Sequence, residues 1–395
     1  MDGQLSSGTL AATVAASSIR SIRMTAWRDL DDPEAGGSEL HADRVASRWA
    51  AAGLDVELRT SSVPGEAFET TRNGYRVTRR GGRYEVFAQV LSEGLRPNGP
   101  RPDAVVEIWN GMPFFSPLWF RGPRLTILHH VHGEMWRMAL SPLLATVGDV
   151  TERKLAPLLY RTTPISTLSA SSRDEIIERL GLPAAQVHVV EPGIDPMYSP
   201  GGARSEDPLV VAVGRLVPVK RYDVLFAALA DARRTVPALR AVVVGEGYER
   251  ARLEAVRSSL GAEDWIELPG RLDDADKLAL YRAAWVVASS SLREGWGMTL
   301  TEAAACATPS VATDIAGHRD AVEHGVTGLL VPDDAALGPA IVRVLADGAL
   351  RERLGAAALA RAARFDWGRA ASRLFSLLDP AGSLRASRGG PPGST

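Results

Sequence analysis

Short apolar runs alternate with amphipathic stretches along almost the whole chain, and this alternation restricts the fold more than any other feature. An apolar run followed by a segment of helical periodicity is typical of a βαβ unit, and repeated units build parallel sheets that helices cover. The chain has 395 residues, and about 100–200 residues per domain predicts two or three domains. We therefore expect an α/β protein with two doubly wound, Rossmann-like domains.

The alternation assigns most of the chain to strands and helices. In the first half, we expect helices at 38–52 and 169–180 and strands at 19–27, 54–60, 104–109, 125–130, 163–166 and 187–190. In the second half, we expect strands at 209–213, 241–244, 265–268, 285–288, 309–312 and 328–331. Helices are expected there at 222–233, 248–260, 276–284, 299–307, within 334–363 and at 367–378.

A segment without periodicity divides the chain at residues 191–208. It contains four prolines and three glycines, which is typical of a linker. We therefore expect a first domain at 19–190 and a second at 209–366, facing each other across a cleft. Residues 1–18 are expected to be a loose leader, and the Gly-, Pro- and Ser-rich residues 379–395 a disordered tail.

Composition excludes several classes of protein. The hydrophobic fraction of 45% excludes a mostly disordered chain, and a net charge of −2 gives no basic field for nucleic acid. Cys306 is the only cysteine, so the chain has no intramolecular disulfide and no cysteine-rich zinc site. No run of 18 apolar residues occurs, and Asp2 stands where a signal peptide needs positive charge. A cytoplasmic protein is expected.

Ligands of open α/β sheets bind beyond the carboxyl ends of the strands, so the loops there are the candidates for chemistry. Gly36 and Gly37 lie between the first strand and the first helix. Adjacent glycines let a ligand approach the backbone, and a helix N-terminus favours an anion. The alternative is an ordinary loop with Ser38 as the N-cap, and the residues alone leave both open.

Two cations, Arg215 and Lys220, follow the first strand of the second half. Lys220 is one of three lysines in the chain. Arginine presents a fork to paired phosphate oxygens, whereas lysine presents a point charge. The loop is predicted to bind phosphate, and two solvated cations are the alternative.

The next loop contains Gly245-Glu246-Gly247, which partly matches a dinucleotide fingerprint. Arg250 stands at the third glycine position, so the GxGxxG pattern fails. We favour a tight turn over NAD binding.

A fourth loop carries two glutamates, Glu294 and Glu302, separated by seven residues that include Gly295 and Gly297. Its glycines expose N–H groups just before a helix, which suits anions and hydroxyls. Glu302 has a structural alternative, because Thr299-x-x-Glu302 matches a capping box. Glu294 has no evident capping role.

Histidines cluster at the end of a first-half strand, at His129, His130 and His132. A metal site is one interpretation, but no acidic or cysteine partner stands at a suitable spacing. Contact with substrate is favoured. Asp29-x-Asp31 and Asp274-x-Asp276 match a metal-binding Asp-x-Asp, but two such matches among 47 acidic residues are expected by chance. Asp273 is instead predicted to cap the helix that follows, and no metal is expected.

Together, the Gly36-Gly37 loop, the Gly214-Arg215 to Lys220 loop and Glu294-x7-Glu302 resemble the retaining nucleotide-sugar glycosyltransferases of family 4, which have the GT-B fold. Residues 320–332, DAVEHGVTGLLVP, are similar to the same family. The resemblance covers roughly residues 22–378, and its motifs occur in the family's order, each between a strand and a helix.

The resemblance implies a role for each site residue. Arg215 and Lys220 hold the donor diphosphate, and Glu302 accepts hydrogen bonds from the ribose hydroxyls. Glu294, near the anomeric carbon, and His132, facing the sugar and acceptor, are the implied catalytic residues. The other implied donor-binding residues are Gly36, Gly37, Arg271, Leu272, Gly295, Trp296, Gly297, Met298, Thr299 and Leu300. Trp296 stands where phenylalanine is commoner in the family, and helix 367–378 is implied to cross back to the first domain.

The resemblance further implies a transfer with retention from a nucleotide diphosphate sugar to a hydroxyl acceptor, without a metal ion. No separate cofactor is implied, because the nucleotide sugar is itself the donor substrate. No pair of carboxylates across the scissile bond is readable, unlike in most glycoside hydrolases. A non-catalytic nucleotide-sugar sensor and a nucleotide-dependent oxidoreductase remain as alternatives. The second lacks its fingerprint, and His132 favours catalysis over the first.

A basic run in the first half consists of Arg72, Arg76, Arg79, Arg80 and Arg83. Weak contact with an anionic membrane surface is one interpretation. A solvated β-hairpin is favoured.

Overall fold

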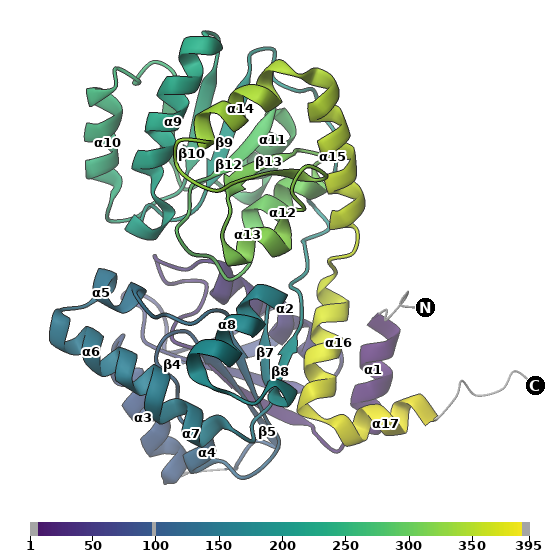
Figure 1. Ribbon diagram of the computed structural model, residues 1–395. Coiled ribbons are helices and arrows are strands. Elements are labelled where there is room, and N and C mark those ends of the chain that lie inside the picture. The colour runs from purple at the N-terminus through teal and green to yellow at the C-terminus, as the bar shows by residue number, and fades with distance from the viewer. Residues whose placement is uncertain (1–6, 97–99, 389–395) are drawn as a thin grey trace, which may run out of the picture. The chain divides into compact units, whose positions relative to one another are not determined.

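In a computed structural model, which describes residues 7–96 and 100–388, the chain forms two α/β units. The first unit runs to Gly193 and takes in the stretch from Trp367 onward, and the second unit is Ile194–Asp366. Each unit has its own sheet with helices packed against it (Figure 1). Two doubly wound, Rossmann-like units confirm the predicted fold class. The chain passes from one unit to the other at Gly193, inside the segment expected to be a linker.

The sheet of the first unit has the strand order β3-β4-β2-β1-β5-β6-β7-β8. All neighbours are parallel except β3 and β4, which form an antiparallel hairpin. A parallel sheet is covered on both faces, so its strands are apolar along their length, and β5 is buried at every residue. The strands are β1 Ser21–Thr25, β2 Asp55–Thr60, β3 Glu69–Arg72, β4 Tyr75–Arg79, β5 Ala104–Trp109, β6 Arg124–Leu128, β7 Ile165–Thr167 and β8 Val187–Val189.

The helices of the first unit come from both ends of the chain. They are α1 Ser7–Ala16, α2 Gly37–Ala51, α3 Glu85–Leu95, α4 Ser116–Trp119, α5 Met135–Ala139, α6 Pro142–Val150, α7 Ala156–Tyr160, α8 Ala170–Leu180, α16 Trp367–Leu378 and α17 Pro380–Arg388. A π-helical turn, Thr151–Leu155, joins α6 to α7, and a 3₁₀ turn, Ala184–Gln186, precedes β8. In the part of the chain that the structure describes, no helix is long and apolar enough to cross a bilayer.

The sheet of the second unit is parallel, with the order β11-β10-β9-β12-β13-β14. Its strands are β9 Leu209–Val213, β10 Arg240–Val244, β11 Ile266–Gly270, β12 Val286–Ser289, β13 Ser310–Thr313 and β14 Gly328–Val331. Its helices are α9 Tyr222–Thr235, α10 Arg250–Ser259, α11 Asp274–Ala283, α12 Met298–Ala305, α13 Ala316–Ala321, α14 Leu337–Ala346 and α15 Gly348–Ala362, with a 3₁₀ turn at Pro218–Lys220. The strand order reverses between β9 and β12, and ligands of such sheets bind beyond a reversal of this kind.

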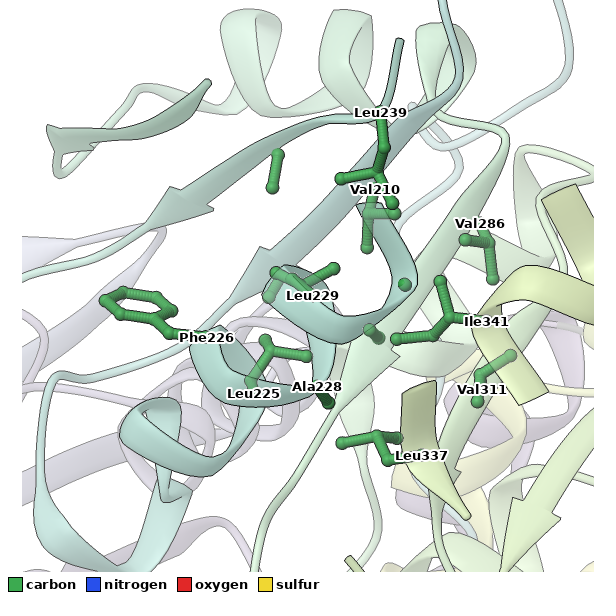
Figure 2. Packing of buried hydrophobic residues seen from close by; sticks show 14 of the residues in the cluster. Val210, Leu225, Phe226, Ala228, Leu229, Leu239, Val286, Val311, Leu337 and Ile341 are labelled. Atoms are coloured by element: carbon green, nitrogen blue, oxygen red, sulfur yellow. The ribbon is translucent and has the colours of Figure 1, made fainter. Parts of the chain in front are cut away.

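The core of the second unit lies between this sheet and two of its helices. Figure 2 shows side chains of α9 and α14 packed toward the valines of the central strands. The residues labelled there include Leu225, Phe226 and Leu229 of α9, Leu337 and Ile341 of α14, and Val210, Val286 and Val311 of the strands. These positions are buried, so this side of the sheet and the inner faces of α9 and α14 are apolar.

The expectation of a loose leader is wrong for the described residues before β1. Ser7–Ala16 forms α1, which packs against α16 and α17. Leu10 and Val14 lie one turn apart and are each 4% exposed, so apolar burial orders a segment that has no strong pattern of its own. The Ser17 hydroxyl donates a hydrogen bond to Asp379.

The expected disordered tail is also wrong in part, because Pro380–Arg388 forms α17; residues 389–395 lie outside the described residues. The preceding helix, α16, belongs to the first unit. Its Phe375 contacts the ring of Trp49, whose indole N–H donates to the Ala371 carbonyl at 3.0 Å. The C-terminal helix thus completes the first unit by covering α2.

The Gly245-Glu246-Gly247 loop is a site of close loop packing. A Cβ atom at Gly245 would lie 1.9 Å from the Gly214 carbonyl oxygen, and one at Gly247 would lie 2.2 Å from the Leu216 carbonyl oxygen. The Leu216 N–H donates to the Glu246 carbonyl at 2.8 Å. These glycines therefore let the loop after β10 dock against the loop after β9.

This packing predicts a large cost for adding one methyl group. Gly245→Ala should destabilise the protein by about 3 kcal/mol or more, because the new Cβ meets a backbone atom that cannot turn aside. Gly261→Ala is the control, since Gly261 also has a positive φ of +59° but nothing within 4 Å, and it should cost about 1 kcal/mol. Urea unfolding measures both, and equal losses would show that backbone conformation alone requires Gly245.

Candidate functional site

The loops after β9 and β12 are held together at the reversal of the second unit's strand order. The Lys220 ammonium donates a hydrogen bond to the Glu294 carboxylate, which also accepts one from the Ser291 hydroxyl at 2.8 Å. The Ser290 hydroxyl lies 2.8 Å from the carbonyl oxygens of both Lys220 and Arg221. The structure therefore brings two predicted site residues, Lys220 and Glu294, into direct contact.

The charge state of Glu294 follows from its surroundings. Burial alone would raise the pKa of this carboxyl, but attraction to Lys220 and His318 and hydrogen bonds from Lys220 and Ser291 more than offset that effect. The pKa of Glu294 is therefore lowered, and the group is a carboxylate at neutral pH. It accepts hydrogen bonds and stabilises positive charge, and it does not serve as a proton donor.

Arg215 lies on the same loop after β9 as Lys220. Its side chain is half-buried, and within the described residues it has no hydrogen-bond or ion-pair partner. Lys220 is already paired with Glu294, so Arg215 is the cation of this loop with all its donors available to a ligand.

Residues of α13 that the sequence analysis missed also border the Glu294 loop. His318 is 1% exposed, with Nδ1 2.8 Å from the Thr313 carbonyl and Nε2 3.2 Å from the Ser289 hydroxyl. A Cβ at Gly317 would lie 2.5 Å from the Glu294 carbonyl oxygen, so only glycine permits this contact. The signal was present, because both residues follow β13, another strand whose carboxyl end lies at this edge.

The segment from Gly295 to Leu300 leads into α12. Gly297 is the N-cap, with a φ of +103°, and α12 begins at Met298, so the first N–H groups of Met298 and Thr299 point out of the helix. Trp296 is 2% exposed and packs edge-on against Phe365 at 5.2 Å. The Trp296 ring therefore packs in the core, and only the backbone of this residue is available to a ligand.

The capping-box interpretation of Glu302 is wrong, because the helix starts before Thr299 and Gly297 is its N-cap. Glu302 is 6% exposed and accepts a hydrogen bond from the Tyr281 hydroxyl at 2.8 Å on Oε2. Its Oε1 has no hydrogen bond from any described residue. Burial raises the pKa of Glu302, an effect that Lys277 and the Tyr281 hydrogen bond reduce.

Tyr281 and Lys277 form the surroundings of Glu302. Both come from α11, whose N-cap is Asp273 as predicted: its carboxylate accepts the Asp276 N–H at 2.8 Å. The pKa of Lys277 is raised overall, because attraction to Glu302 and its other partners outweighs burial. Glu302 is thus held by a neighbouring helix and not by its own. Arg271 and Leu272 follow Gly270, the last residue of β11.

In the first unit, the Gly36-Gly37 loop begins α2. Gly36 is the N-cap, and its N–H donates to the Glu39 carboxylate at 2.8 Å. Ser38 is therefore not the N-cap, contrary to the alternative weighed from the sequence. Its hydroxyl instead accepts a hydrogen bond from the Asn110 amide at 3.3 Å, which links the loops after β1 and β5.

The histidine cluster separates into two parts. His129 is buried and its Nε2 lies 3.1 Å from Nδ1 of His41 on α2. His130 and His132 stack on one another, with ring centres 5.1 Å apart, and His132 also contacts Trp136. No group of three His, Cys, Asp or Glu side chains placed to hold a metal ion is found in the described residues.

A buried glutamate that sequence reasoning missed shapes the His132 loop. Glu152, in the π-helical turn, accepts hydrogen bonds from the N–H groups of His132 and Gly133 and from the Trp136 indole, at 2.8, 3.1 and 3.0 Å. Its side chain is fully buried. Nothing in the local sequence marked it, because its partners lie 16 to 20 residues away.

The basic run lies on and just after the β3–β4 hairpin, which confirms that prediction. The hairpin is not solvated throughout, because one of its arginines is buried. Arg79 is 1% exposed and bonds Asp29 at 2.7 Å. Each member of the run has a carboxylate partner; the pairs are Arg72 with Asp29 and Asp31, Arg76 with Asp55, Arg79 with Asp29 and Asp31, Arg80 with Glu69, and Arg83 with Glu34. Asp29-x-Asp31 therefore serves ion pairing within the first unit.

Two family models match consecutive parts of the chain. "Glycosyltransferase Family 4" matches residues 35–198, and "Glycosyl transferases group 1" matches residues 198–361. Among similar proteins is a D-inositol 3-phosphate glycosyltransferase of Kribbella flavida, 36% identical over 86% of this chain and 90% of that protein. Another, from Kineococcus radiotolerans, is 29% identical over 90% and 93%.

Solved structures resemble the fold. Sucrose-phosphate synthase from Thermosynechococcus elongatus has a TM-score of 0.77 at 22% identity, covering 91% of this chain and 98% of that one. Anabaena HepE in complex with UDP-glucose has a TM-score of 0.72 at 19% identity, covering 91% and 99%. At these identities the likeness shows the fold alone.

The buried histidines of the first unit predict a pH-dependent stability. Burial lowers the pKa of His129 to about 4. Burial also lowers the pKa of His41, and the neighbouring His129 lowers it further. His129 is protonated near pH 6.5 in the unfolded chain but only near pH 4 in the folded chain. The unfolded state therefore binds more protons between these pH values, and stability falls as the pH drops. His129 should contribute a loss of about 2 kcal/mol between pH 7 and 5.

Urea unfolding at pH 7 and 5 measures this loss. His129→Phe removes the titrating group, so the variant should show a smaller fall in stability between the two pH values, whatever its absolute stability. An unchanged pH dependence in the variant would show that His129 does not control it.

Proposed function

This chain belongs to glycosyltransferase family 4, and from that premise we propose that it moves a sugar from a nucleotide diphosphate sugar to a hydroxyl acceptor. We further propose that the transfer retains the anomeric configuration and needs no metal ion. The observation that carries the proposal is the Arg215, Lys220 and Glu294 arrangement at the strand reversal of the second unit. It places two cations and one carboxylate where α/β sheets bind ligands.

The diphosphate is the natural ligand of the cations. Breaking the bond between the sugar and the diphosphate leaves an electron pair on the phosphate oxygen, and charge-assisted donors fixed in advance stabilise that oxygen. Arg215 supplies a guanidinium with no protein partner among the described residues. Lys220 and the N-terminus of α12 supply further positive charge on adjacent loops.

Glu294 suits the opposite charge. As the leaving group departs, positive charge grows on the sugar ring and its carbon. A carboxylate whose pKa is lowered stays ionised there and favours the transition state over the ground state. In the proposed retaining step, the acceptor oxygen bonds to the carbon on the face that the phosphate leaves, and its proton passes to a departing phosphate oxygen.

The named relatives suggest which substrates to test first. A UDP-sugar is the first donor to test, because the HepE structure holds UDP-glucose. Inositol 3-phosphate is the first acceptor to test, because the sequence relatives are named for it. We propose that His132, on the loop that Glu152 fixes, faces the acceptor.

The donor loop predicts loss of nucleotide affinity. Each charge-assisted hydrogen bond is worth about 1.5–3 kcal/mol, so Arg215→Ala and Lys220→Ala should each weaken UDP binding by about tenfold or more. Arg234→Ala, on the exposed face of α9, is the matched control and should bind like the wild type. Calorimetry in buffer with EDTA also tests metal independence. Unchanged binding by both loop variants would contradict the assignment.

The two glutamates are expected to differ in kinetics. Glu294→Gln should lower kcat more than it raises the donor KM, because its contribution grows in the transition state. Glu302→Gln should chiefly raise the donor KM.

Tyr281→Phe removes the hydrogen bond to Glu302 and should weaken UDP binding more than 2′-deoxy-UDP binding if the carboxylate meets the ribose. Equal losses with both nucleotides would assign Tyr281 and Glu302 to stability alone.

A further inference from the structure

The first unit exposes a row of large apolar side chains on the segment from α5 to α7. Met138, Leu143, Leu144, Val147, Val150, Leu155 and Leu158 are all at least 45% exposed, and Leu143 reaches 75%. We call these seven residues the apolar ridge. Figure 1 shows α5 and α6 at the outer edge of the first unit.

The longest helix of the ridge, α6, has small residues inside and large apolar residues outside. Ala145, Gly148 and Ala156 face inward, and a Cβ at Gly148 would lie 2.7 Å from the Trp136 ring. A helix on the surface of a water-soluble fold normally turns its large apolar residues to the core. This segment therefore presents a second apolar face that no described residue covers.

Charges beside the ridge are mainly positive. Arg137, Arg153, Lys154 and Arg161 are exposed, against the two carboxylates Glu134 and Asp149. Asp149 is already 3.6 Å from Arg153, whereas Arg137, Lys154 and Arg161 have no carboxylate partner in the described part of the chain. The face therefore combines exposed aliphatic side chains with unpaired cations.

We propose that the apolar ridge docks on the surface of an anionic lipid bilayer. Aliphatic side chains enter the boundary between headgroups and acyl chains while flanking cations meet anionic lipid, which is how amphipathic helices lie on membranes. Protein interfaces are instead enriched in exposed aromatic residues, and the ridge contains none. The occupant is thus lipid in preference to a protein partner or a second copy of this chain.

The same segment holds the loop of the proposed acceptor residue. Glu152 lies between ridge residues Val150 and Leu155, and its carboxylate bonds the backbone of His132 and Gly133. Docking would therefore bring this loop close to the bilayer. The docking itself does not depend on sugar transfer, so it stands or falls separately from the proposed function.

Sedimentation of the full chain with vesicles tests the proposal. The wild type should bind vesicles of phosphatidylcholine with phosphatidylglycerol, and should bind pure phosphatidylcholine much more weakly. Leu143→Gln/Leu158→Gln should weaken binding by about tenfold or more, because two aliphatic side chains that would enter the bilayer are lost. Lys154→Gln and Arg161→Gln should each weaken it about fivefold. Added salt should do the same.

A matched control is Leu260→Gln/Val326→Gln, which replaces two exposed apolar residues of the second unit and should bind like the wild type. Circular dichroism and UDP binding verify that the ridge variants fold. The proposal is wrong if the wild type fails to bind anionic vesicles or if the ridge variant binds equally well. It is also wrong if light scattering finds a dimer that the ridge variant abolishes while vesicle binding is absent.

Discussion

Burial of both faces of each parallel sheet is the constraint from which the rest of the structure follows. Strands such as β5 and β9 have few positions for polar side chains, so charged groups gather in the loops at the carboxyl edges. In the second unit, the reversal between β9 and β12 brings two such loops together. The Lys220 and Glu294 pair, in which both side chains are half-buried, joins them.

Buried carboxylates hold the loops of the first unit in place. Glu107, on β5, accepts the N–H groups of Phe114 and Ser116 and the Tyr160 hydroxyl. Glu152 does the same for the His132 loop, and Glu39 for Gly36. Each carboxylate replaces lost hydration with several donors, which is the condition for burying a charge. The loops are therefore organised before any ligand arrives, and preorganised donors favour transfer chemistry.

The segment from α5 to α7 connects the apolar ridge with the His132 loop. Its inward face supplies Glu152 to the His132 loop, and its outward face is the apolar ridge. The π-helical turn that contains Glu152 joins α6 to α7, and such turns are frequent at functional sites. A single segment thus connects the surface that we assign to lipid with the loop that we assign to the acceptor.

The sequence alone determined the α/β class, the positions of the main strands along the chain and the break near residue 193. It also determined the loops that carry Arg215, Lys220, Glu294 and Glu302. These follow from local periodicity and from the rule that ligands bind at the carboxyl edge. Tertiary structure decided which side chains meet. The Lys220 to Glu294 contact spans 74 residues, and the Tyr281 to Glu302 contact spans 21.

Tertiary packing also ordered α1 and α17, whose own patterns are weak, and buried Glu152 beneath a loop far from it in sequence. Gly245, Gly247 and Gly317 are each required because the backbone of another loop approaches closely, and this approach is visible only in the folded structure. Periodicity reports which face of an element is buried, but it carries no information about which distant partner covers that face. That is why the site residues were predictable one loop at a time, whereas their contacts required the fold.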